Sequence, residues 1–263
     1  MIKYKQKWTQ SSINGEEIMV LNERQTHILK ILRENKSVNV KTLAKTLYVS
    51  EATVRRDLKE MQALGLLERS HGGAWLPENM DEVSMFVRME KNAREKERVA
   101  TKALPHVPSF HSVFIDSSST ALALAERLDL SHKTVVTNSL QTAIQLSKKE
   151  NINLVLLGGS IRTSTNSTVG SFTNRQLEGF TFDLMICSCS AVKAGYAFER
   201  SLEQRELKCS AFEKSAKRIL LVDSTKFVAQ ATYRAAKLTD FDFVVSDSFP
   251  ENPEGFEGVR IFA

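Results

Sequence analysis

Residues 49–58 read VSEATVRRDL, a run whose apolar residues recur at the spacing of a helix. Val54 and Leu58 lie four residues apart and, with Met61 further along, would share one face of that helix. Ser50 stands at the position of an N-cap, where its hydroxyl can accept a hydrogen bond from an otherwise unpaired backbone N–H group. The run therefore predicts a helix that begins after Ser50 and buries a single apolar stripe.

Two other stripes at helical spacing precede this helix, one over residues 28–32 and one over residues 40–47. Residues 48–50 form the break between the second predicted helix and the third. A connection of this length holds two helices at a steep angle. The sequence therefore predicts three short helices around one core, with a helix-turn-helix at about residues 38–57.

A hairpin is predicted directly after the third helix. Residues 66–69 and 74–76 flank residues 70–73, which read SHGG, and glycines in this place favour a tight turn. They would also let the backbone of the turn approach a partner closely. Helices and hairpin together predict a winged helix-turn-helix domain, α/β in class, over residues 21–76.

The face of the third helix opposite its apolar stripe is small, polar and basic. At about 100° per residue, this face carries Ala52, Thr53 and Arg56, and Arg55 lies on its flank. A small residue and a hydroxyl followed by arginines can enter the major groove of DNA and offer bidentate donors to guanine or phosphate. A solvated helix face is the alternative, and the adjoining basic hairpin favours DNA. The residues predicted to contact DNA are Lys41, Ser50, Ala52, Thr53, Arg55, Arg56, Lys59, Arg69, His71, Gly72 and Gly73.

The excess of positive charge lies in this part of the chain. Residues 1–76 hold 13 Lys or Arg against 8 Asp or Glu, whereas residues 77–263 hold 23 of each. Lys and Arg release counterions where they meet a polyanion, so a small basic domain joined to a neutral one fits double-stranded DNA as a partner. Residues 1–20 are basic without a helical or strand period, and are predicted to form a flexible arm.

The sequence contains no signal-like start and no apolar run near the roughly 20 residues that a membrane span needs. We therefore expect a cytoplasmic protein with no membrane contact. Its three cysteines, Cys187, Cys189 and Cys209, form no CxxC pair and lie among apolar or helical residues. They are interpreted as packed thiols, so neither a metal nor a cofactor is expected.

Short apolar runs alternate with helix-length segments through residues 99–263, which predicts an α/β domain with a mainly parallel sheet. The charged stretch before it, residues 77–98, has a helical period and is predicted to be a linker helix. The six predicted strands contain residues 113–115, 134–136, 153–157, 184–187, 218–222 and 243–245.

Polar residues follow several of these strands, at the sheet edge where parallel sheets bind ligands. The loop 116–120, DSSST, precedes a predicted helix, so hydroxyls and backbone N–H groups would converge there on a phosphate. Such residues also serve as ordinary caps and turns, but their recurrence after several strands, with Lys226 adding a positive charge, favours a site. The residues predicted to bind a phosphorylated effector are Asp116, Ser117, Ser118, Ser119, Thr120, Thr137, Asn138, Gly158, Gly159, Lys208 and Lys226.

The chain resembles the DeoR family of bacterial transcription regulators in VSEATVRRDL, RSHGGA, DSSST, VTNSL, LLGGSIR, STVG and DSTKF, which occur in family order. The resemblance implies DNA contacts by Thr53, Arg55, Arg56 and the HGGA hairpin, and a sensor domain similar to ribose-phosphate isomerases. It also implies a repressor that a phosphorylated sugar or polyol releases from DNA. Residues 188–193 depart from the pattern: they read SCSAVK where the family commonly carries glycine and aspartate, so the expected carboxylates near the sugar hydroxyls are missing there.

A sugar-phosphate isomerase with an accessory domain is the main alternative. Such an enzyme needs a carboxylate or histidine base beside the carbon chain of its substrate. Segment 188–193 lacks acids, and His106 and His111 precede the first strand, at the opposite end of the sheet. RNA binding is disfavoured because the basic domain shows no aromatic stacking platform. Because one winged module makes a limited DNA interface, we expect a homo-oligomer on an inverted repeat.

Overall fold

A computed structural model of the chain describes residues 22–35, 37–63, 66–70, 72–75, 85–250 and 256–262. The chain divides into two units, one of residues 1–62 with 67–76 and one of residues 63–66 with 77–263. The predicted arm at residues 1–20 lies outside the described residues. Within the described ranges, every helix is too short or too polar to span a lipid bilayer.

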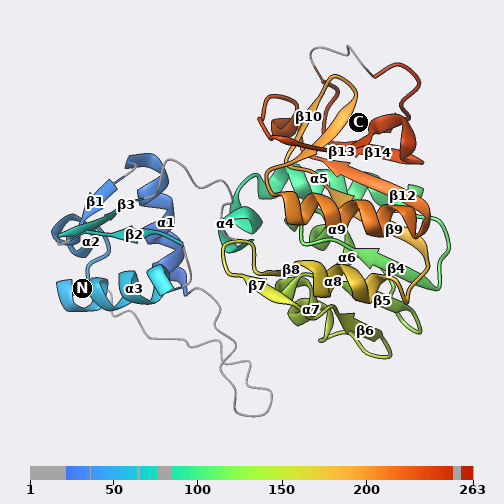
Figure 1. Ribbon diagram of the computed structural model, residues 1–263. Helices are drawn as coiled ribbons and strands as arrows, with labels where there is room; N and C mark the ends of the chain where they lie inside the picture. The colour runs from blue at the N-terminus through green and yellow to red at the C-terminus, as the bar shows by residue number, and fades with distance from the viewer. Residues whose placement is uncertain are drawn as a thin grey trace. The chain divides into compact units, whose positions relative to one another are not determined.

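Three helices form the core of the first unit, as the apolar stripes predict (Figure 1). Helices α1 (Glu23–Asn35), α2 (Val40–Thr46) and α3 (Glu51–Ala63) contribute its buried side chains. Ser50 is the N-cap of α3, because its Oγ accepts the N–H of Thr53 at 3.1 Å. The helix-turn-helix prediction is confirmed. The apolar residues buried here include Ile28, Leu29, Leu32, Leu43, Val54, Leu58 and Met61.

The predicted hairpin is present as β2 (Glu68–Arg69) and β3 (Gly73–Trp75), which pair antiparallel. A further strand, β1 (Ser37–Asn39), pairs with the other edge of β3. The sequence does not predict β1, because three residues are too few to show an alternating pattern. Gly73 permits this close pairing, since a Cβ at that position would lie 2.5 Å from the backbone oxygen of Val38.

The second unit begins, among its described residues, with two helices instead of the single linker helix expected over residues 77–98. They are α4 (Met85–Glu90) and α5 (Ala93–Ala103), and Asn92 between them has a left-handed backbone (φ 55°) that ends the first helix. Helix α5 also continues past residue 98, because its C-terminal half packs in the core of this unit.

The described residues of the second unit form a parallel sheet of seven strands. The six predicted strands are present, so the predicted fold class is confirmed; the seventh, β15, has only two residues and no readable pattern. Along the sheet the order is β15-β14-β12-β9-β4-β5-β6. The strands are β4 (Ser112–Ile115), β5 (Thr134–Thr137), β6 (Asn153–Leu156), β9 (Phe182–Ser188), β12 (Ser215–Val222), β14 (Phe243–Ser246) and β15 (Ile261–Phe262).

Helices cover both faces of this sheet (Figure 1). Alternate residues of the central strands are buried on opposite faces of the sheet. In β4, for example, Ile115 packs in the core on one face and Phe114 in the core on the other. Helices α5, α6 (Ser119–Ala125) and α7 (Leu140–Leu146) contribute to one core, whereas α8 (Ser171–Leu177) and α9 (Leu202–Glu213) contribute to the other.

Two small antiparallel sheets and three single-turn 3₁₀ helices complete the described part of the unit. The hairpin joins β7 (Ser160–Arg162) to β8 (Ser167–Val169), and the three-stranded sheet has the order β10-β11-β13. Neither was predicted, because both follow from how the loops between the parallel strands pack. The remaining bounds are β10 (Ala191–Lys193), β11 (Tyr196–Glu199), β13 (Tyr233–Lys237), η1 (Leu104–His106), η2 (Ser224–Phe227) and η3 (Leu238–Asp240).

Candidate functional site

The residues predicted to contact DNA lie on the outer face of α3 and at its N-cap, on the hairpin beside it and, for Lys41, in α2. In the described part of the first unit, this face carries exposed cationic side chains next to the small N-terminal residues of α3. Arg55 also forms an ion pair with Glu51, one turn earlier, at 2.6 Å. Gly73 is buried in the hairpin, and His71 lies outside the described residues. Those that are exposed are Lys41, Ser50, Ala52, Arg55, Arg56, Lys59, Arg69 and Gly72, while Thr53 is half-buried.

Asp57, the residue after the two arginines, points the opposite way and fixes α3 to α1. Its carboxylate accepts hydrogen bonds from Nε and Nη2 of Arg24 at 2.5 Å and 3.0 Å. Asp57 is only 1% exposed, and its hydrogen bonds raise the pKa of Arg24 above the ordinary value. A second tie runs from Gln25 to Glu60 at 2.9 Å. The RRD sequence thus places Arg55 and Arg56 on the exposed side of α3 and Asp57 on its buried side, where Arg24 balances the charge of the carboxylate.

A cavity of about 350 Å³ lies in the second unit, where β4, β9 and β12 end. These three strands are neighbours in the sheet, so the residues that follow them converge. Its lining also includes residues of α4, α5, β11 and α9. The residues that line it include Arg88, Lys91, Asn92, Lys96, Asp116, Ser117, Ser118, Ser119, Thr120, Thr165, Ser188, Cys189, Ser190, Glu199, Arg200, Gln204, Lys208, Asp223, Thr225 and Lys226.

Asp116 orders the loop that follows β4. Its Oδ1 accepts the backbone N–H of Ser118 at 3.1 Å and the Ser118 hydroxyl at 2.5 Å. Its Oδ2 accepts the N–H of Ser188 at 3.2 Å, which joins the end of β4 to the end of β9. Ser118 in turn caps α6 by accepting the N–H of Ala121 at 3.1 Å. The loop is therefore pre-formed by hydrogen bonds within the protein.

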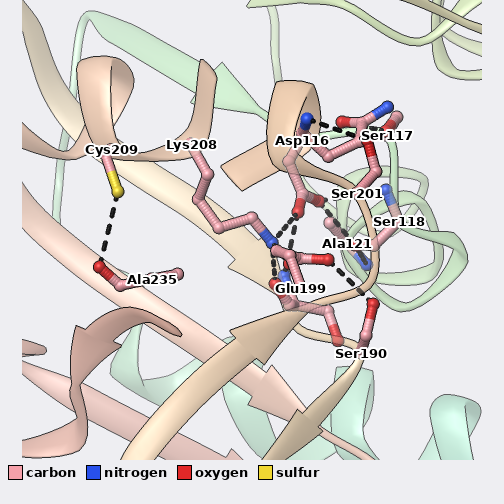
Figure 2. A network of polar contacts seen from close by, with 12 residues as sticks. Asp116, Ser117, Ser118, Ala121, Ser190, Glu199, Ser201, Lys208, Cys209 and Ala235 are labelled. Atoms are coloured by element: carbon pink, nitrogen blue, oxygen red, sulfur yellow. Dashed lines mark hydrogen bonds and ion pairs between the residues drawn. The ribbon is translucent and has the colours of Figure 1, made fainter. Parts of the chain in front are cut away.

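Lys208 lies at the floor of the cavity between two carboxylates (Figure 2). Its Nζ is 2.9 Å from Oδ2 of Asp116, and it also donates to Glu199 and to the backbone oxygen of Ser188. Burial lowers the pKa of Lys208, but Glu199 and Asp116 more than offset this effect and hold that pKa well above its usual value. The charge of Lys208 is therefore already neutralised by the protein.

Most of the other charged residues that line the cavity are cationic. Lys96, 6% exposed, donates to the backbone oxygen of Lys91 at 2.6 Å and to that of Arg88. The pKa of Lys96 is lowered to about 7: burial is the main cause, Lys226, Arg88 and Lys91 also lower the pKa, and Asp223 offsets part of the effect. Lys226 lies 4.0 Å from Oδ2 of Asp223. Among the described residues that line the cavity, six are cationic and three are acidic.

Family models match both units. A DeoR-like helix-turn-helix domain matches residues 24–80, and a DeoR C terminal sensor domain matches residues 91–248. This chain belongs to the DeoR family. It is accordingly a transcription regulator that binds an operator in double-stranded DNA, and the enzyme alternative is not favoured.

Relatives in this family span nearly the whole chain. The glycerol-3-phosphate regulon repressor of Escherichia coli K12 is 30% identical over 88% of this chain and 93% of its own length. The lactose phosphotransferase system repressor of Streptococcus mutans is 32% identical, over 82% and 89%. The regulator GolR of Listeria innocua is 32% identical, over 86% and 90%. Among solved structures, ribose 5-phosphate isomerase A of Methanocaldococcus jannaschii aligns with 15% identity and a TM-score of 0.38, over 52% of this chain and 55% of its own.

Four residues predicted to bind the effector do not line the cavity of this DeoR-family sensor domain. The Thr137 hydroxyl accepts the N–H of Ser139 at 3.1 Å, and Asn138 donates to the backbone oxygen of Thr168 at 3.1 Å. Gly158 accepts from the hydroxyl of Thr173 at 2.9 Å, and a Cβ at Gly159 would lie 2.0 Å from that hydroxyl. These four residues follow β5 and β6, which lie to the side of the three strands whose ends line the cavity.

Glu199 and Lys96 were missed as site residues of this DeoR-family chain. Glu199 ends β11 and brings a carboxylate to the cavity, where segment 188–193 has none. Lys96 enters from α5, which the sequence assigned to a linker. No local pattern marked Glu199, because the antiparallel β10-β11-β13 sheet places it. For Lys96, a basic residue at helical spacing within the predicted linker was the available signal.

Proposed function

We propose that this regulator is released from its operator by a phosphorylated sugar or polyol that binds in the cavity at the ends of β4, β9 and β12. The observation that carries the proposal is the composition of the lining. Its cations outnumber its acids, and the carboxylates of Asp116 and Glu199 are already balanced in part by Lys208. A phosphate that leaves water needs such cations and hydrogen-bond donors.

Buried polar atoms of two residues that line the cavity support a ligand that also bears hydroxyl groups. Ser188 Oγ and Asp223 Oδ2 have no hydrogen-bond partner within the described part of the chain, although Nζ of Lys226 lies 4.0 Å from Asp223 Oδ2. Buried polar atoms are normally paired. A ligand hydroxyl can donate to the carboxylate oxygen of Asp223 and pair with the hydroxyl of Ser188. The names of two relatives, which refer to glycerol 3-phosphate and to a lactose phosphotransferase system, point to the same chemical class.

The site within this cavity is assigned as follows. Lys226, one-quarter exposed, faces the phosphate together with the loop 116–120, whereas Lys208 orients Asp116 and Glu199. On the DNA side, we assign operator contacts to the exposed face of α3 and the hairpin. The protein acts as a homo-oligomer, because two winged modules related by a two-fold axis double the DNA interface.

Calorimetry of the full chain against sugar and polyol phosphates and their dephosphorylated counterparts tests this function. Binding of the phosphorylated forms alone is expected, with a loss of operator affinity of about 5- to 150-fold. Lys226→Ala should keep operator binding and lose that response, and Lys148→Ala, at an exposed lysine outside the cavity, should respond as the wild type does. Equal binding of both ligand forms, or a full response by Lys226→Ala, would contradict the proposal.

A further inference from the structure

The C-terminal end of α4 is held by donors that line the cavity. The backbone oxygen of Arg88 accepts from Nζ of Lys96 and, at 3.3 Å, from the hydroxyl of Ser119. Lys96 also donates to the backbone oxygen of Lys91. The last carbonyl groups of a helix have no partner within the helix, so these donors complete the end of α4.

The side chain of Arg88 adds a second set of contacts with the cavity wall. Its guanidinium donates at 3.3 Å to the backbone oxygens of Ser117 and Thr165, both of which line the cavity. Met85, at the other end of α4, is fully buried. Helix α4 is therefore anchored at its N-terminal end by apolar packing and at its C-terminal end by polar contacts to the cavity.

Lys96 is a weakly compensated cation. Its hydrogen bonds go to neutral carbonyl groups, and the charged groups that face it are Asp223, which favours its ammonium form, and Lys226, Arg88 and Lys91, which oppose it. Hydrogen bonds between an ammonium and an anion are stronger than those to a neutral carbonyl. An anion in the cavity would therefore compete successfully for the protons of Lys96.

We infer that Lys96 and Ser119 couple the cavity to the DNA-binding unit: a bound anion takes their hydrogen bonds from the backbone oxygen of Arg88 and frees the C-terminal end of α4. This inference rests on the proposed function, because it specifies how that site is regulated. Helix α4 is the first described element after residues 76–84, which connect the two units along the chain. Helix α4 is thus the described element of the sensor domain that follows the DNA-binding unit most closely in the sequence.

A coupling role and a purely ligand-binding role for Lys96 predict different operator affinities for Lys96→Met in the protein without ligand. If Lys96 only bound the anion, Lys96→Met would keep full operator affinity in the protein without ligand. If Lys96 holds α4, Lys96→Met resembles the effector-bound state, and its operator affinity falls by about 5- to 150-fold without any ligand. Ser119→Ala, which removes one of the two donors, should shift the affinity in the same direction by a smaller factor.

The experiment uses the full chain and a DNA fragment selected for binding to it. Operator affinity and hydrogen exchange of peptides covering residues 85–92 are measured with and without glycerol 3-phosphate, and with inorganic phosphate to separate the anion from the polyol. We expect the probe to speed exchange at α4 in the wild type. In Lys96→Met without the probe, the amide groups of α4 should exchange faster than those of the wild type. Adding the probe should change that rate little.

Lys102→Met is the matched control, because Lys102 lies on the same helix and donates to the backbone oxygen of Asp247, outside the cavity, at 3.1 Å. It should behave as the wild type does. Wild-type operator affinity and α4 exchange in Lys96→Met would overturn the inference, as would slower exchange at α4 when the probe binds. Should Lys96→Met fail to fold, unchanged affinity and exchange in Ser119→Ala would overturn it instead. Failure of the wild type to bind any phosphorylated probe would contradict the proposed function, whereas the ligand-free comparison tests the coupling separately.

Discussion

The two buried lysines of the sensor domain have opposite pKa shifts because their partners differ. Lys208 lies between Asp116 and Glu199, and its pKa is held well above the usual value although burial lowers it. Burial lowers the pKa of Lys96 to about 7, because Asp223 only partly compensates its charge. The first lysine is a fixed structural charge. The second has a protonation state that a ligand can change near neutral pH.

Binding of a phosphorylated ligand should therefore take up a proton through Lys96. At pH 8 this lysine is mainly neutral in the free protein, while a phosphate monoester is already a dianion. The bound anion raises the pKa of Lys96, so ligand affinity should fall as pH rises above about 7, by up to about tenfold per pH unit. Calorimetry at pH 8 in two buffers of different ionisation enthalpy measures the uptake.

Two variants separate this proton from others that titrate in the same range. Lys96→Met should bind without the uptake, and Lys102→Met should show the wild-type value. Identical heats in both buffers for the wild-type protein would mean that Lys96 keeps its protonation state when the ligand binds.

At the scale of elements, periodicity in the sequence predicted the three helices of the first unit and six strands of the parallel sheet. Each of these helices buries one apolar stripe and the central strands bury both faces, so their apolar residues form a regular pattern in the sequence. Strand β1 and the β10-β11-β13 sheet were not predictable in this way, because their short strands are set by neighbouring segments. The break between α4 and α5 depends on the left-handed backbone of Asn92, which no apolar pattern reveals.

The same distinction applies to the candidate site. Strand ends in a parallel sheet lie at one edge, so the loop 116–120 and Lys226 could be located from the sequence. Which strand ends meet depends on strand order, and the order β12-β9-β4 excluded Thr137 and Gly158. Residues such as Glu199 and Lys96 come from elements outside the parallel strands, and their position is a result of tertiary packing.

The tie between α1 and α3 predicts an asymmetric effect of two substitutions. Arg24→Met leaves the carboxylate of Asp57, 1% exposed, without its cation and should lower the free energy of unfolding of the first unit by about 3 kcal/mol. Asp57→Asn should cost less, about 1–2 kcal/mol, because the Arg24 side chain is 31% exposed and can reach water. Urea denaturation of the full chain, followed by a signal from the first unit, measures both.

Arg56→Ala is the control for this comparison, since Arg56 lies on the same helix but is exposed. It should change the free energy of unfolding by less than about 0.5 kcal/mol and weaken operator binding by about 1–3 kcal/mol. A larger loss of stability from Asp57→Asn than from Arg24→Met would show that the carboxylate does not need this cation.

At the scale of the whole molecule, the distribution of net charge along the chain limits how strongly a single chain can bind an operator. The net positive charge lies in residues 1–76, and the remainder of the chain has a net charge of zero, so the excess charge that attracts DNA belongs to the DNA-binding unit. One winged module buries a small interface, of the order of 600–1,000 Å² for single modules of this kind. Specific binding against a genome of competing sites therefore favours two modules acting together.

We accordingly expect the full chain to form a symmetric oligomer that binds an inverted repeat. Two half-sites about one helical turn apart, or a multiple of that distance, should be protected together, because a two-fold axis places both recognition helices in successive major grooves on one side of the DNA. Sedimentation of the full chain at micromolar concentration measures the oligomer, and footprinting on the selected DNA fragment measures the spacing. Moving one half-site by half a helical turn should weaken binding strongly, whereas moving it by a whole turn should weaken it less. A monomer in solution that protects single, unpaired half-sites would contradict this arrangement, because each winged module would then bind its site alone.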